Sequence, residues 1–378
     1  MREGLVDRSI RALHRIAGLR VGSSSDPIGA AGAHRSLRAG EGLLFRHLGA
    51  ALVHADPDQL ASLQSKSGGE LMAVHPERVV RTTGLDATPR PRHSDEAQRT
   101  WGLAATGITR SQFSGRGVRL AILDTGIDRD HPDFAERSIE SRSFLSDPSV
   151  NDANGHGTYC AGIACGPSSP ALPPRYGVAS EAALYVGKVI GDEGQGADGD
   201  ILAALDWSIH CGCAIICLSV GTPVARGEPH SPVYERIAQR SLAAGTVIVA
   251  AAGNGSLRPD VIAPVDHPAN CPSILAVAAI DPYLRIAPFC CGGINPGGGE
   301  IDVVAPGVAV RSAWPRPELH RTQSGTSMAT PYVVGIGALL AEARPSIRGR
   351  ALRDLIRQTA KPLPLPPRDV GAGLIQAP

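Results

Sequence analysis

The chain has 378 residues, an apolar fraction of 43% and a formal net charge of +1. This length allows one large domain with an appendage, and the nearly balanced charge gives no reason to expect nucleic acid or an anionic membrane as a partner. No run of about 18 apolar residues occurs, so the sequence predicts no membrane span.

The first forty residues predict an N-terminal extension. Met1 to Arg20 mixes Arg and His with Leu and Ile, which indicates a short amphipathic helix and lacks the continuous apolar region of a secretory signal. Val21 to Gly42 is rich in Gly, Ser and Ala, a composition typical of a linker. The eight cysteines do not resemble a disulfide framework in a chain of this size. Reduced thiols and the missing signal favour a cytoplasmic setting.

Residues 41–83 predict a small α+β unit. Asp56 and Pro57 are typical of a helix start, and the helix should end before Gly68. The expected strands are Gly49–Ala55, Glu70–His75 and Arg78–Thr82. So small a unit cannot build a robust core, so it should pack on the domain that follows. Residues 84–100 are rich in Pro, Arg and polar residues and predict an exposed linker.

From residue 101 onward, short apolar runs alternate with helical segments. The expected strands are 118–123, 183–190, 214–218, 246–250, 273–278 and 301–304, and the expected helices are 157–165, 198–210 and 233–244. This alternation predicts an α/β fold over residues 101–378, a mostly parallel, doubly wound sheet flanked by helices. A functional site in such a sheet lies beyond the carboxyl ends of the strands.

Four polar residues stand at those element ends. Asp124 follows the first strand, Asn254 follows the strand over 246–250, and His156 opens a helix within Asn-Gly-His-Gly-Thr. Ser327 precedes an apolar helical run in Ser-Gly-Thr-Ser-Met-Ala. Each could be a turn or capping residue, but four such residues flanked by glycines on one rim favour a shared role.

These residue types fit nucleophilic catalysis. A serine hydroxyl becomes nucleophilic when a base takes its proton, and histidine can do so near neutral pH. An aspartate can orient the histidine and stabilise its charged form. An asparagine amide and the serine N–H can bind a developing oxyanion.

Four segments resemble the signatures of the subtilisin family of serine proteases, also called subtilases or peptidase family S8. They are Asp124–Ile127, Asn154–Thr158, Ala252–Asn254 and Ser324–Ala329. The resemblance implies a serine endopeptidase with a triad of Asp124, His156 and Ser327, and with Asn254 in the oxyanion hole. It also implies that the substrate backbone binds between Ser219-Val220-Gly221 and the segment from Gly194 to Gly196.

The resemblance has consequences for metals and cofactors. No cofactor is required for the family's chemistry, but Asp133 matches an acidic calcium ligand of the family. The partner loop, Gly166 to Tyr176, contains no Asp or Asn, so we expect that calcium site not to be intact. Cys211 and Cys213 follow His210, but a second pair with zinc spacing is missing, so a metal site is not expected there.

Residues 41–83 resemble, more loosely, the family's inhibitory propeptide. The small unit, the linker and the catalytic domain follow one another in the chain, and this order predicts a self-inhibited precursor. In it, the strand at Arg78 leads the following residues into the substrate cleft, and the chain cuts itself between Thr83 and Trp101. The expected partners are therefore peptide or protein substrates and the chain's own N-terminal part. The alternative is that the first hundred residues form a permanent partner-binding domain.

Two other functions compete with an active serine endopeptidase. One is a catalytically silent relative that only binds peptides, which a damaged triad would favour. The other is an acid-type peptidase that uses a glutamate and an aspartate with a similar serine loop. The intact Gly155-His156-Gly157 segment argues against the second alternative.

Overall fold

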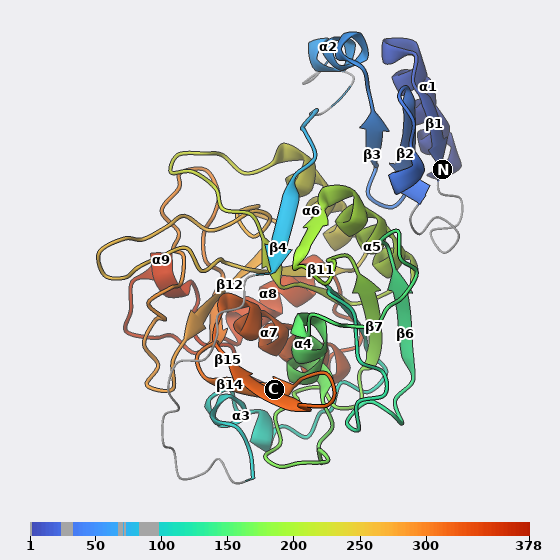
Figure 1. Ribbon diagram of the computed structural model, residues 1–378. Coiled ribbons are helices and arrows are strands. Elements are labelled where there is room, and N and C mark those ends of the chain that lie inside the picture. The colour runs from blue at the N-terminus through green and yellow to red at the C-terminus, as the bar shows by residue number, and fades with distance from the viewer. Residues whose placement is uncertain (1, 24–32, 67–70, 72, 83–97) are drawn as a thin grey trace.

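The computed structural model describes residues 2–23, 33–66, 71, 73–82 and 98–378 (Figure 1). The helices are α1 (Arg2–Ala17), α2 (Pro57–Ser65), α3 (Trp101–Ala105), α4 (His156–Cys165), α5 (Asp198–His210), α6 (Pro232–Ala243), α7 (Thr326–Ala343), α8 (Arg350–Gln358) and α9 (Pro367–Val370), with 3₁₀ turns η1 (Ala33–Ser36) and η2 (Ile108–Arg110). The strands are β1 (Arg20–Ser23), β2 (Glu41–Phe45), β3 (Ala50–His54), β4 (Val79–Thr82), β5 (Arg119–Asp124), β6 (Ile139–Ser143), β7 (Ala183–Lys188), β8 (Gln195–Ala197), β9 (Ile215–Leu218), β10 (Val220–Gly221), β11 (Val247–Ala251), β12 (Leu275–Ile280), β13 (Val303–Pro306), β14 (Val310–Ala313) and β15 (His320–Gln323).

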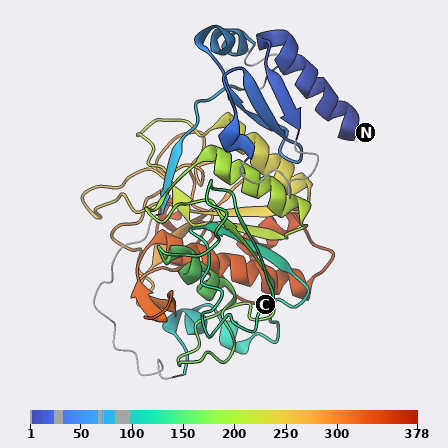
Figure 2. The same ribbon diagram turned by 45° about the vertical axis from the view of Figure 1, so that its right-hand side comes forward.

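A seven-stranded parallel sheet forms the centre of the large domain, in the order β13-β12-β11-β9-β5-β7-β6. Its middle strands are apolar along their whole length because both faces are covered. Helices α4 and α7 pack together on one face, and α5 and α6 lie over the other (Figure 2). The predicted doubly wound α/β fold is confirmed.

Helix α7 is the axis of one of these layers. Every residue from Thr326 to Ala341 is buried, which a helix can tolerate only when other elements surround it. It contacts α4, α8 and the strands β9, β11, β12 and β13. Among the described residues, no helix has both the length and the apolar character needed to cross a bilayer.

The N-terminal part folds as one small unit and not as an extension followed by a unit. β1 pairs in parallel with β2, and β2 pairs antiparallel with β3. Leu13 of α1, Leu63 of α2 and Leu19 form a small buried cluster over this sheet. The amphipathic helix expected within residues 1–20 is confirmed as α1. The linker expected over residues 21–42 is wrong for residues 21–23, whose backbone pairs with β2. It is also wrong for residues 33–36, which form η1, and for residues 41–42, which begin β2.

The small unit packs on helices α5 and α6 of the large domain (Figures 1 and 2). His34 and Arg35 both contact the buried carboxylate of Asp200 in α5, the histidine Nε2 at 2.8 Å and the arginine Nε at 2.7 Å. The backbone N–H of His47 donates to Asp206 Oδ1 at 2.7 Å. Phe45 joins the core of the large domain. The expectation that this unit packs on the following domain is confirmed.

Two of the three strands expected in the small unit are present. The helix α2 begins after Asp56, whose side chain accepts the N–H of Gln59 in a capping box. The strand expected over 70–75 is wrong for residues 73–75, which have no regular structure, and two of its other residues lie outside the described part.

Strand β4 leaves the small unit and enters the large domain. It lies between β10 and β8 as the middle strand of a three-stranded antiparallel sheet. The sequence predicted that this strand leads the following residues between these two segments, but β4 itself lies there, and residues 83–97 lie outside the described part. The linker and processing region expected at 84–100 lies outside the described residues up to position 97.

Candidate active site

His156 and Asp124 form a buried hydrogen-bonded pair beyond the carboxyl end of β5. His156 Nδ1 lies 2.7 Å from Asp124 Oδ1, and the two side chains are 5% and 0% exposed. Burial alone would lower the pKa of His156, but the adjacent carboxylate reverses this and holds that pKa above its ordinary value. The aspartate therefore fixes the Nδ1–H tautomer and leaves Nε2 as the basic nitrogen.

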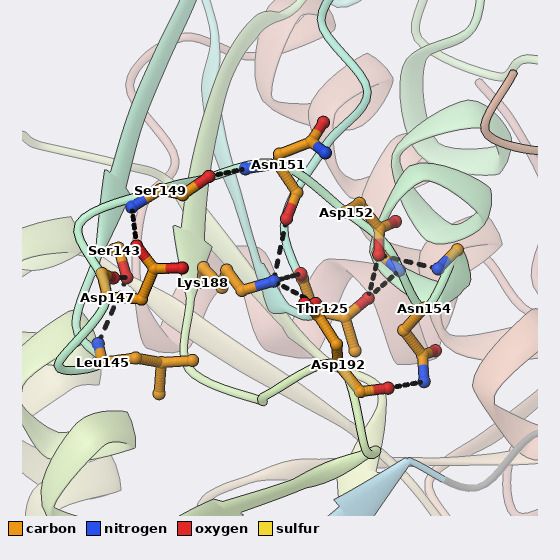
Figure 3. A network of polar contacts seen from close by, with 12 residues as sticks. Thr125, Ser143, Leu145, Asp147, Ser149, Asn151, Asp152, Asn154, Lys188 and Asp192 are labelled. Atoms are coloured by element: carbon orange, nitrogen blue, oxygen red, sulfur yellow. Dashed lines mark hydrogen bonds and ion pairs between the residues drawn. The ribbon is translucent and has the colours of Figure 1, made fainter.

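Asp152 holds together the two loops that carry this pair (Figure 3). Its Oδ1 accepts from Thr125 Oγ1 at 2.8 Å and from the N–H of Gly155 at 2.7 Å, and its Oδ2 accepts from both the N–H and the Oγ1 of Thr158. A Cβ at Gly157 would lie 2.3 Å from the carbonyl oxygen of the facing loop. Only glycine permits this approach, which brings the start of α4 against the end of β5.

Lys188 fixes the same region from the next strand (Figure 3). Its buried Nζ donates to the carbonyl oxygens of Thr125 and Asn151, each at 2.8 Å, and contacts Asp192 Oδ1 at 2.5 Å. The side chain of Asn154 donates to the Asp192 carbonyl oxygen at 2.9 Å. One ammonium group therefore connects the aspartate loop, the histidine loop and the turn that leads to β8.

Ser327 is the second residue of α7, as expected for a serine at a helix start. Its Oγ donates to the carbonyl oxygen of Ser219 at 2.9 Å. Cys160 Sγ lies 3.8 Å from His156 Nδ1 and 3.7 Å from the Ser327 carbonyl oxygen. A single thiol thus borders both the histidine and the serine, so the structure brings these two residues to one place.

Asn254 lies just beyond β11, next to the serine. Its Oδ1 accepts both the N–H and the Oγ1 of Thr326, at 2.9 and 3.0 Å. Because these bonds hold the amide oxygen, the amide nitrogen is directed to the other side, away from Thr326. The candidate oxyanion donor is therefore oriented by the residue that precedes Ser327.

The two segments expected to bind a substrate backbone face each other across β4. Val220 and Gly221 pair with Thr82 and Arg81. On the other side, β8 pairs with Val79 to Arg81, and the Thr82 N–H donates to the Gly194 carbonyl oxygen at 3.2 Å. Gly194 and Gly196 therefore lie along the opposite edge of β4. Strand β4 is thus added between two segments of the large domain, the kind of pairing by which an extended peptide can bind.

The residues around Asp133 do not fit a calcium ion. Its Oδ1 accepts the Ala171 N–H at 2.6 Å, and its Oδ2 accepts Tyr176 Oη at 2.6 Å and contacts His320 Nε2 at 3.0 Å. A calcium ion needs oxygen lone pairs, whereas these groups present hydrogen atoms to the carboxylate. These bonds lower the pKa of Asp133 to about 2 against the opposing effect of burial.

Metal-binding geometry occurs at two places among the described residues. One is the group of Asp124, His156 and Cys160, and the other combines Asp133 with two histidines, His131 and His320. The cysteines that follow His210 belong to neither group among the described residues.

Comparison with known proteins identifies the family. The profile of the subtilase family matches residues 115–373. The chain belongs to the subtilase family. Over 268 residues it is 35% identical to subtilisin BL of Lederbergia lenta, which covers 70% of this chain and 91% of that protein. It is 36% identical over 282 residues to a thermostable alkaline protease of Halalkalibacterium halodurans, covering 73% and 72% of the two chains.

Similar identity extends to other subtilisins. Subtilisin DY of Bacillus licheniformis is 32% identical over 259 residues, which is 68% of this chain and 89% of that protein. The resemblance seen in the four sequence segments is thus confirmed, and this subtilase is a serine-type endopeptidase.

Two positioning residues of this subtilase are missing from the sequence-based prediction. Asp152 and Lys188 lie in the loop before the histidine and at the end of β7, and neither belongs to a resembling segment. The scarcity of lysine was a usable signal, since the chain contains three lysines and one of them is buried in the structure. A lysine at the end of an apolar strand is costly to bury unless its charge has partners.

Proposed function

We propose that this subtilase hydrolyses peptide bonds through Asp124, His156 and Ser327, with Asn254 in the oxyanion hole. The observation that carries the proposal is the buried hydrogen bond of 2.7 Å between His156 Nδ1 and Asp124 Oδ1. It leaves Nε2 as the proton acceptor, and among the described residues Nε2 has no hydrogen-bond partner. An unoccupied base beside a serine at a helix start fits acyl transfer.

The chemical steps follow from these groups. Ser327 Oγ attacks the carbonyl carbon of the scissile bond, and its proton passes to His156 Nε2. The carbonyl oxygen gains the negative charge, which the Ser327 N–H and the Asn254 amide stabilise. The histidine then gives the proton to the leaving amine, and water hydrolyses the acyl-enzyme by the reverse roles. Because the Ser327 hydroxyl donates to Ser219 here, its O–H must turn toward the histidine before the proton can pass to Nε2.

We further propose that the chain is made as a precursor that inhibits and then cuts itself. Strand β4 supports this, because it fills the position of a bound substrate strand between β10 and β8. The covalent connection holds it there at high effective concentration. The alternative function, a catalytically silent peptide-binding relative, would require a defect in the His–Asp–Ser set, and all three side chains are present.

The nucleophile is tested by Ser327→Ala and a fluorophosphonate probe. The variant should lose nearly all hydrolysis of a casein or peptide substrate, a loss of about 10⁶-fold in kcat carried over by analogy from subtilisin. It should keep the wild-type circular dichroism, because one buried hydroxyl is removed without a change of backbone. The probe should label Ser327 in the wild type. Labelling of another residue, or an active alanine variant, would refute the assignment.

A further inference from the structure

A buried carboxylate without a partner lies beside the substrate cleft. Asp266 is 4% exposed, and none of the described residues donates a hydrogen bond to its side chain or forms an ion pair with it. Burial raises the pKa of Asp266 to about 7, as expected for a carboxyl group that has lost water and gained no donor. Nothing in the catalytic steps uses this group, so its burial needs another explanation.

Backbone hydrogen bonds place Asp266 between two walls of the cleft. Its N–H donates to the carbonyl oxygen of Ala252, in the segment that follows β11. The next residue, His267, exchanges backbone hydrogen bonds of 2.8 and 3.0 Å with Thr222, which directly follows β10. The aspartate therefore joins the strand that pairs with substrate backbone to the segment that leads to Asn254.

Two glycines allow the carboxylate to lie close to both walls. An ideal Cβ on Gly253 would lie 2.3 Å from Asp266 Oδ2, and one on Gly221 would lie 3.6 Å from the same atom. Gly253 also has a φ of +104°, which side chains rarely adopt. The carboxylate thus lies where side chains at positions 221 and 253 would otherwise be. We describe it as the floor between the two walls that carry these glycines.

The register of β4 shows which substrate residue reaches this floor. Thr82 lies opposite Val220, so the next residue of a strand bound in this register lies opposite Ser219. The Ser219 carbonyl oxygen accepts the hydroxyl of Ser327. The carbonyl group of that next residue is therefore the one presented to the nucleophile, and its side chain enters between the walls that Asp266 closes.

We propose that Asp266 selects substrates with arginine or lysine immediately before the scissile bond. The inference rests on the proposed function, because it assigns a preference to the same cleft. A guanidinium or ammonium group would supply the charge and the donors that the carboxylate lacks. Arginine can bind both carboxylate oxygens with two parallel N–H groups, so it should be the better of the two.

The test compares five quenched fluorescent peptides that differ only in the residue before the scissile bond, which is Arg, Lys, Phe, Leu or Glu. The full-length chain is incubated until its mass is constant, and kcat/KM is then measured. We expect Arg and Lys to exceed Phe and Leu by about 30-fold or more, the usual scale for a buried charge pair. Benzamidine, a small arylamidinium cation, should slow fluorophosphonate labelling of Ser327.

Asp266→Asn removes the charge and keeps the shape. This variant should lose the preference for Arg and Lys and the protection by benzamidine, and it should gain relative activity on Phe and Leu. It should also melt no lower than the wild type, because an unpaired buried carboxylate does not stabilise the fold. Asp260→Asn is the matched control, since Asp260 is exposed in the preceding loop, and it should leave the preference unchanged.

The outcomes separate two kinds of failure. If Ser327 is labelled by the probe but Phe or Leu peptides are cleaved as well as the Arg peptide, the role of Asp266 is refuted and the proposed function stands. The same holds if Asp266→Asn keeps the wild-type preference. If Ser327 is not labelled and no peptide is cleaved, the proposed function itself is wrong.

Discussion

At the scale of single residues, hydrogen bonds to neighbouring residues determine which atom of each candidate side chain can contact a substrate. The Asn254 amide oxygen is held by Thr326, so its nitrogen can serve a substrate oxygen. The Asp124 carboxylate orients His156, so Nε2 can take a proton. The sequence could supply the residue types and their places at element ends. It could not supply these orientations, because they depend on contacts between loops far apart in the chain.

Asn254→Ala should lower kcat by about 10²–10³, a size carried over by analogy from subtilisin, with little change in KM. The reason is that the amide meets negative charge that exists in the transition state and not in the bound substrate. Steady-state kinetics on one peptide substrate measures both parameters. A rise in KM at constant kcat would make Asn254 a substrate-binding residue instead.

The ionised carboxylate of Asp133 should stabilise the fold, and this contribution should disappear at acid pH. Its pKa falls from an ordinary 3.8 to about 2 in the folded chain, so its stabilising contribution is present above about pH 4 and is lost as the pH falls toward 2. Asp133→Asn should cost about 1–3 kcal/mol of unfolding free energy at neutral pH. Thermal unfolding at several pH values should show the difference from wild type shrinking between pH 4 and 2.

The control for this experiment is Asp130→Asn, an exposed aspartate three residues away. It should change the melting temperature little at any pH. If calcium were instead the partner of Asp133, a chelator would lower the melting temperature of the wild type and spare Asp133→Asn.

At the scale of elements, the apolar strands and the flanking helices of the large domain were predictable because each shows its own periodicity. Strand β1 was missed for a physical reason. Residues 20–23 are Arg-Val-Gly-Ser, too short and too polar to indicate a strand alone, and they form one because β2 offers its edge. The strand expected at 73–75 is wrong for the opposite reason, since none of the strands in the described part of the chain pairs with it.

Strand β4 offers a matched pair of substitutions. Val80 is fully buried, whereas Val79 is 54% exposed. In a Ser327→Ala background, which removes self-cleavage, Val80→Asp should release β4 because a buried carboxylate without a partner is costly. Trypsin should then cut after Arg78 or Arg81 at least about tenfold faster, as followed by mass spectrometry. Val79→Asp should behave like its parent, and equal rates in the two variants would show that β4 is not held through Val80.

At the scale of the whole molecule, the two units depend on one another. The small unit places Phe45 in the core of the large domain, and its residues His34 and Arg35 bond to Asp200. The sequence predicted this association from size alone, since residues 41–83 are too few to bury an adequate core. It could not predict that α1 joins the same unit, because that packing involves only a few apolar side chains.

The precursor hypothesis is tested by intact mass. Freshly purified wild type should lose its N-terminal part with time, with a cut between Thr83 and Trp101, because the strand before this stretch lies between β10 and β8, where we propose that substrates bind. Ser327→Ala should stay whole under the same conditions. The register of β4 would present the bond after Thr83, whereas the preference proposed for Asp266 favours a cut after Arg90, Arg92 or Arg99, so the site of the cut shows which of the two prevails. An active wild type that remains at full length would refute self-processing.

If β4 inhibits the chain as proposed, its covalent attachment also fixes the stoichiometry of inhibitor to cleft at one to one. A separate inhibitor protein must be made in at least equal amount, and its complex dissociates when both partners are scarce. A strand carried on the same polypeptide is always present once per cleft, however few or many copies a cell makes. The inhibition of the uncut chain would then not depend on the protein's concentration. Activation would depend on a cut within each molecule and not on the amount of a separate inhibitor.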